Sequence, residues 1–175
     1  FTIPTGCIRV HVSGYNGTPI PSYKIIDAYE QDYWIYYFYE YTNANGTALL
    51  YVPAGEHTVY PDIYPEDYYG EEVYVDEGET VDVYFNLSTI VVYLNTTLSC
   101  DEDISIGVVS ADYRYFYRSI LEFPLYIHVY PGEYTVVLPG SNTSVYGSYG
   151  YGEEVYVNVS EVSIVNVTFN LTAIR

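Results

Sequence analysis

The sequence predicts an all-β protein built from two tandem seven-stranded β-sandwiches, and three observations lead to this prediction. Apolar and polar residues alternate with a period of two along most of the 175 residues, which is the spacing of half-buried strands. No long stretch carries apolar residues at the helical spacing i, i+3, i+4, i+7. Three sequence blocks also occur twice in the same order, which indicates an internal duplication.

The duplicated blocks place the boundary between the two modules near residue 87. One block, with the sequence YGEEVYV, is identical in both copies, and the other two are similar. The pairs are Val52–Val59 with Val129–Val136, Tyr69–Val75 with Tyr151–Val157, and Phe85–Ser88 with Phe169–Thr172. We therefore expect module one at residues 1–87 and module two at residues 88–175. Because no flexible linker separates them, we expect a stiff connection.

Alternating segments between turn signals give the individual strands. In module one the predicted strands are residues 7–13, 22–29, 33–41, 47–52, 56–60, 71–76 and 79–87. In module two they are residues 89–96, 104–110, 113–119, 124–130, 132–138, 153–159 and 161–171. Short strands at this spacing are typical of a β-sandwich.

The order of these motifs resembles the transthyretin-like, or carboxypeptidase-regulatory-like, β-sandwich family. The motifs that carry the resemblance are Gly17-Thr18-Pro19-Ile20, Thr42 to Gly46, Val52 to Val59 and Val73 to Leu87. Module two keeps the later half of the pattern but lacks the first turn. The resemblance implies an immunoglobulin/transthyretin-like fold of the kind found in appendages, adhesin stalks and surface-layer parts, usually without catalysis. Fold alone does not fix function.

The charge balance excludes several classes of partner. The chain has 5 Lys and Arg against 23 Asp and Glu, for a net charge of −18. Nucleic acid and anionic lipid both require a basic surface, and no apolar run is long enough to span a membrane.

The run Asp101, Glu102 and Asp103 is the best candidate for binding Ca²⁺, although its spacing matches no known loop motif.

Asparagines give the strongest functional signal. The chain has nine Asn, and eight of them begin the sequence N-x-Ser/Thr, where chance would give roughly one or two. These sequons begin at Asn16, Asn45, Asn86, Asn95, Asn142, Asn158, Asn166 and Asn170. Turn formation alone would explain Asn16, Asn45 and Asn142, but not those among strand residues. We therefore expect covalent N-glycans and a secreted, extracellular protein.

The two ends and the two cysteines suggest assembly with other copies. The chain lacks Met and begins Phe1-Thr2-Ile3-Pro4-Thr5, which we interpret as a mature N-terminus after cleavage. The last residues repeat the module junction and then stop, so residues 1–6 are a candidate donor strand for a neighbouring copy. Frayed ends are the alternative.

Cys7 and Cys100 are the only cysteines. We expect a bond between successive subunits. The alternatives are two buried free thiols, or a different strand count that brings the two cysteines together in one chain.

Catalytic signals are weak, so we do not expect an enzyme. His11, His57 and His128 lack ligand-spaced partners in the sequence, and no metal site is firm. The excess of Tyr, 26 residues, suits half-buried interfaces. We expect a subunit of a glycosylated extracellular filament, similar in character to archaeal surface filaments, which forms a homopolymer and contacts other cells or surfaces. The alternatives are a monomeric carbohydrate-binding or adhesin module and, third, a secreted hydrolase.

Overall fold

The structure is a computed structural model that describes residues 5–31, 34–62, 70–96, 104–110, 115–120, 123–138, 153–159 and 161–171. The chain divides into two compact units, Phe1–Leu87 and Ser88–Arg175. The described residues form strands β1 to β14 and one short 3-10 turn, η1 (Tyr15–Gly17), and none of them lies in an α-helix. The all-β prediction is therefore confirmed. None of the described segments is a helix long and apolar enough to cross a membrane.

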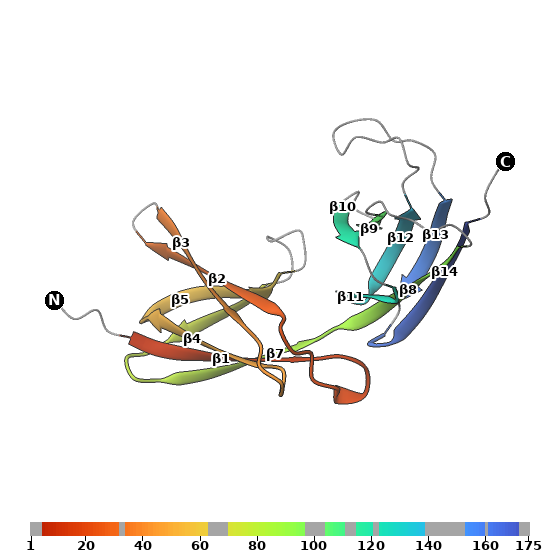
Figure 1. Cartoon of the computed structure of the whole chain (residues 1–175). Helices are drawn as coiled ribbons and strands as arrows, with labels where there is room; N and C mark the ends of the chain where they lie inside the picture. The colour runs from red at the N-terminus through yellow and green to blue at the C-terminus, as the bar shows by residue number, and fades with distance from the viewer. Residues whose placement is uncertain are drawn as a thin grey trace. The chain divides into compact units, whose positions relative to one another are not determined.

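Two sheets make up the first unit (Figure 1). In the three-stranded sheet, β1 (Thr5–Ser13) lies between β4 (Thr47–Pro53) and β7 (Thr80–Asn86). The pairing of β1 with β4 is antiparallel and that with β7 is parallel. The four-stranded sheet has the order β3-β2-β5-β6. Its strands are β2 (Lys24–Gln31), β3 (Trp34–Tyr41), β5 (Gly55–Pro61) and β6 (Glu71–Val75).

Alternate residues of the strands in the first unit supply its core. In β1 the side chains of Ile8, Val10 and Val12 are buried, whereas those between them point outward. The other sheet contributes Ile25 and Val59, both fully buried. This division between core and outer faces follows from the period of two in a pleated strand.

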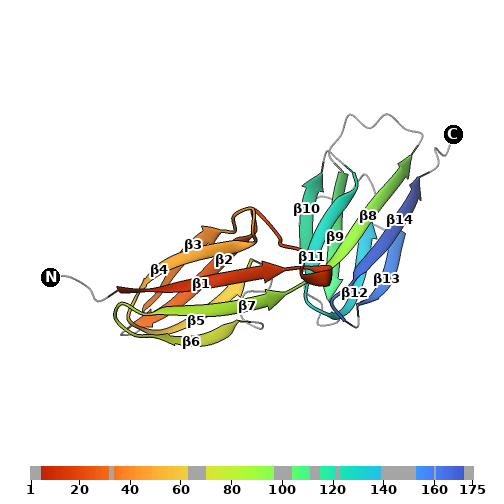
Figure 2. The same cartoon turned by 90° about the horizontal axis from the view of Figure 1, so that it is seen from below.

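The second unit has the same strand order (Figure 2). Its three-stranded sheet has the order β11-β8-β14, with strands β8 (Ser88–Thr96), β11 (Leu125–Val129) and β14 (Ile164–Leu171). Its four-stranded sheet has the order β10-β9-β12-β13, with strands β9 (Ile104–Ser110), β10 (Tyr115–Ile120), β12 (Gly132–Leu138) and β13 (Glu153–Val159). Side chains from both sheets, among them Ile90, Val136 and Phe169, form one core cluster.

Each strand of one unit thus has a counterpart seven strands along the chain, with the same neighbours. The repeated sequence blocks therefore correspond to a repeated topology. Predicted strand limits differ from the observed ones by a few residues. Strand β2, for example, begins at Lys24 rather than residue 22, because Ser22 has φ +57° and lies in a turn. A residue in the left-handed region cannot continue an extended strand.

Candidate functional site

Seven of the eight sequon asparagines lie in the described part of the chain, and all seven are exposed. Two are in turns and five are on strands, and four of those five, all except Asn95, have a buried residue next to them in the sequence. They are Asn16 in η1, Asn45 in the turn before β4, Asn86 on β7, Asn95 on β8, Asn158 on β13, and Asn166 and Asn170 on β14. In the strands, period-two alternation therefore points each sequon side chain away from the core.

Three of these positions take part in side-chain hydrogen bonds that orient the amide group. The Ser13 hydroxyl donates to Oδ1 of Asn86 over 2.7 Å, and Nδ2 of Asn95 donates to Oδ1 of Asn170 over 3.1 Å. In Asn86 and Asn170 the side-chain oxygen Oδ1 thus accepts a hydrogen bond from a side chain of the neighbouring strand. The nitrogen, which is the atom that an N-glycan modifies, is left on the other side of the amide group.

Several predicted site residues lie outside the described residues. These are Phe1, Thr2, Ile3 and Pro4 of the candidate donor segment, Cys100, the candidate calcium ligands Asp101, Glu102 and Asp103, and Asn142. Thr5 is described and begins β1. Among the described residues, no group of three or more His, Cys, Asp or Glu side chains could hold a metal ion.

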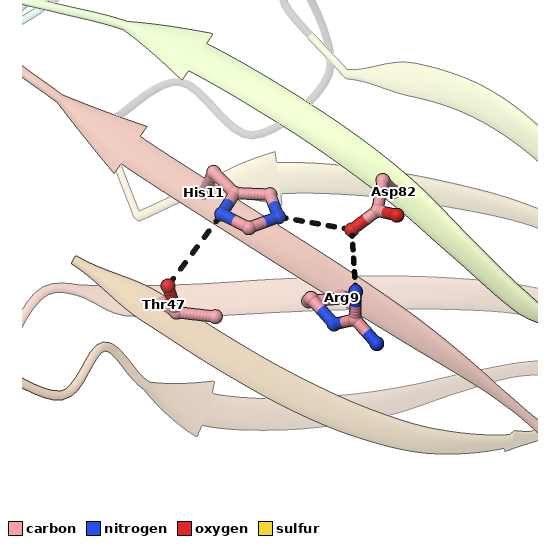
Figure 3. Close-up of polar contacts among 4 residues, drawn as sticks. All are labelled: Arg9, His11, Thr47 and Asp82. Atoms are coloured by element: carbon pink, nitrogen blue, oxygen red, sulfur yellow. Dashed lines mark hydrogen bonds and ion pairs between the residues drawn. The ribbon is translucent and has the colours of Figure 1, made fainter. Parts of the chain in front are cut away.

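A polar cluster occupies the outer face of the β4-β1-β7 sheet (Figure 3). The Asp82 carboxylate on β7 contacts two side chains of β1, with 2.9 Å to Nε2 of His11 and 3.4 Å to Nη1 of Arg9. On the other side of His11, Nδ1 lies 3.5 Å from the Thr47 hydroxyl. The His11 ring also stacks on Tyr84, with centroids 4.7 Å apart.

This cluster is solvent-accessible, because the side chains of its ion pairs are between 33% and 45% exposed. Such surface pairs stabilise a fold by less than about 1 kcal/mol. The sequence did not indicate the cluster, because β1 and β7 are 71 residues apart at this point and only the parallel register brings them together. An outer face with an exposed carboxylate, a guanidinium and stacked rings can bind a polar ligand.

Cys7 lies on the same outer face and carries a free thiol in this structure. Partial burial raises the pKa of the Cys7 thiol, and nearby Arg9 partly opposes that rise. A thiol with a raised pKa is a weaker nucleophile at neutral pH. In the register of the sheet, Cys7 lies opposite Thr80, at the start of β7.

A second polar pair lies inside the first unit. Nδ1 of His57 on β5 is 2.9 and 3.1 Å from the two carboxylate oxygens of Asp27 on β2, and both side chains are fully buried. Nε2 of His57 is 2.9 Å from the Pro53 carbonyl, and the Tyr29 ring stacks on the imidazole. His57 was predicted to be isolated, but cross-strand pairing supplies its partner. Fully enclosed, the pair is a structural element of the core.

No family model matches this chain, and no curated protein matches it. Solved structures with a similar arrangement include the Bacillus anthracis TIE protein, with 12% identity, a TM-score of 0.39, and coverage of 95% of this chain and 34% of that one. The Streptococcal ancillary pilin has 10% identity, a TM-score of 0.41, and coverage of 95% and 62%. The shaft pilin SpaA from Lactobacillus rhamnosus GG has 9% identity, a TM-score of 0.32, and coverage of 99% and 100%.

The chain spans about a third of the length of the TIE protein and under two thirds of the ancillary pilin. At these TM-scores the likenesses carry no argument about function. The function proposed below therefore depends on the residues of this chain.

Proposed function

We propose that this chain is a structural, non-catalytic subunit of a glycosylated extracellular filament or surface appendage of archaeal type. Its two units are seven-stranded sandwiches of the immunoglobulin/transthyretin-like kind. Copies polymerise head-to-tail when a terminal strand of one copy completes a sheet of the next. N-glycans cover the outward faces of the strands.

The observation that carries this proposal is the exposure of every described sequon asparagine. N-glycosylation requires the side-chain amide of the asparagine to be open to solvent, and an asparagine that faced the core could not carry a glycan. Five described sequon asparagines are on strands and all five face outward. An attached sugar at each of these five positions would project into solvent without disturbing the core.

The course of β1 supports the head-to-tail part of the proposal. Because β1 and β7 are parallel, β1 begins at the end of the first unit opposite to Leu87, where the second unit follows. Residues 1–4 precede that outer end. In this proposal a Cys7–Cys100 bond between successive copies would fix the junction.

Electron microscopy and mass spectrometry of the native protein test the proposal. We expect regular fibres, glycopeptides at several sequons, and a disulfide ladder on non-reducing gels. Deletion of residues 1–4 should abolish the fibres but leave the circular dichroism spectrum unchanged. Dispersed particles from the intact chain, together with unmodified asparagines, would refute the proposal.

The outer face of the β4-β1-β7 sheet favours a second candidate, a carbohydrate-binding or adhesin module. Tyr51 is 74% exposed there and Tyr84 is 64% exposed, and the same face carries the Asp82 carboxylate and the Arg9 guanidinium. Sugar rings stack on such aromatic side chains. The carboxylate accepts hydrogen bonds from sugar hydroxyls, and the guanidinium donates hydrogen bonds to them. A glycan array with the wild type and Tyr51→Ala tests this function. Loss of binding in the variant supports it, and the absence of any binding by the wild type refutes it.

A further inference from the structure

Strand β3 is exposed on both of its faces, unlike the other strands of the first unit. Ile35 and Tyr37 on one face are 54% and 59% exposed, and Tyr36 on the opposite face is 50% exposed. By contrast, β4 buries Ala48, Leu50 and Val52 between its exposed residues. Neither face of β3 is therefore closed by the core.

This strand also forms one edge of its sheet. Among the described residues β3 pairs with β2 alone (Figure 1). The Thr42 N–H donates to the Tyr23 carbonyl, and in the register of β2 and β3 these two residues lie opposite each other. Hydrogen-bonded positions alternate along an antiparallel pair. The N–H and C=O groups of Ile35, Tyr37, Tyr39 and Tyr41 therefore point away from β2, toward the outer edge.

Nothing in the composition of β3 protects this edge. Proteins usually block edge strands with Lys, Pro, bulges or several charges. The sequence of β3, WIYYFYEY, has one charged residue, Glu40, whereas β6 at the other edge of the same sheet carries Glu71 and Glu72. The outer tyrosines are also pre-ordered, since Tyr39 packs edge-on against Tyr41 and the Lys24 ammonium lies 5.6 Å from the Tyr39 ring.

We propose that β3 is a self-association site, at which β3 of a second copy of this chain pairs antiparallel across a two-fold axis at Phe38. This inference goes beyond the proposed head-to-tail contact and does not depend on it. The register joins Tyr37 to Tyr39 of the second copy and Ile35 to its Tyr41, so that every outward-pointing backbone group meets a complementary one.

Electrostatics permits a second copy as the occupant, because the register keeps the acidic side chains of the two β3 strands apart. Two chains of charge −18 repel each other wherever acidic surfaces meet. In this register each Glu40 lies opposite Tyr36 of the other copy. The two Glu40 residues are then four residues apart along the strands, about 14 Å, which exceeds the Debye length of about 8–10 Å at moderate salt. Aromatic side chains meet aromatic side chains on both faces.

Disulfide trapping in the full-length chain tests the register. In a Cys7→Ser, Cys100→Ser background, Phe38→Cys puts two thiols on directly opposed residues, whose Cα atoms in such a pair are about 4.5 Å apart, within disulfide range. Tyr36→Cys, on the same face of the same strand, is the matched control, since its counterpart is about 14 Å away. We expect a covalent dimer with Phe38→Cys and monomer with Tyr36→Cys.

Sedimentation equilibrium of the otherwise unmodified chain tests the affinity. Tyr37→Lys adds a blocking charge at the edge and should weaken dimerisation at least tenfold, while Tyr93→Lys, on the central strand β8, should leave it unchanged. Equal cross-linking of both cysteine variants, a monomeric wild type, or equal weakening by both lysine variants would overturn the proposal. The proposal would also be overturned if an added Phe1–Thr5 peptide, and not a second copy, protected the β3 backbone amides from hydrogen exchange. That result would show that the edge binds a donor strand.

Discussion

Replacing His57 with Leu should destabilise the first unit strongly, because it leaves the Asp27 carboxyl buried without its partner. The change removes the contacts of 2.9 and 3.1 Å to the carboxyl oxygens and the one to the Pro53 carbonyl. Both side chains of the pair are fully buried, so water cannot replace the lost bonds. Breaking a buried pair in this way costs about 3–5 kcal/mol.

The expected loss in thermal stability follows from the size of the unit. For a domain of under 100 residues, 1 kcal/mol shifts Tm by about 4–8 °C, so His57→Leu should lower the Tm of the first unit by more than about 12 °C. Differential scanning calorimetry of the full chain measures this change. The transition of the second unit, which lacks the substitution, is the internal reference.

The pH dependence separates a lost ion partner from a simple packing defect. Burial raises the pKa of Asp27, while the nearby charge and hydrogen bonds of His57 lower it in part. A raised pKa in the folded state means that the stabilising contribution is present below the unfolded value of about 3.9 and is lost as pH rises through the folded value. Without His57 that pKa rises further, so the variant should suffer most at neutral pH and recover toward pH 4.

A double variant, Asp27→Leu with His57→Leu, provides the control, because replacing both partners with apolar groups is often nearly neutral. A loss below about 1 kcal/mol for His57→Leu would refute the reasoning. So would a loss that does not change between pH 4 and pH 7, or a double variant no more stable than the single one.

Three further predictions concern local structure, each measured by chemical denaturation. Gly46→Ala should destabilise the first unit more than Gly78→Ala does, because both glycines have positive φ but only at Gly46 would a Cβ contact the Val12 carbonyl. Thr42→Val should cost about 1–3 kcal/mol, since its buried hydroxyl bonds two backbone groups. Phe169→Ala should cost about 3–5 kcal/mol, because the ring is fully buried in the core of the second unit.

The sequence allowed the strands to be predicted because the period of two is a local property. The alternation in Cys7–Ser13 alone identified β1 and its buried face, and the structure places Ile8, Val10 and Val12 inside. The repeated blocks also indicated that the two modules share a topology. The turn at Ser22 could not be predicted in this way, because its left-handed backbone leaves no trace in the hydrophobic pattern.

Contacts between distant strands could not be predicted. His11 meets Asp82, and His57 meets Asp27, only because of registers between strands that are far apart in the sequence. Spacing within one strand contains no information about these registers. A search for ligand-spaced histidines was therefore bound to find each His isolated.

The double-sided aromatic run of β3 shows why the same alternation can mislead. Local sequence indicates that both faces of a strand are apolar, but whether a face is covered depends on the width of the opposing sheet. In the first unit a four-stranded sheet faces a three-stranded one, so an edge strand of the wider sheet lacks a full partner layer. Tyr36 lies on the same face of the sheet as the buried Asp27, yet it is half exposed. Local alternation therefore shows which residues of β3 share a face, whereas the exposure of each face depends on strands that are distant in the sequence.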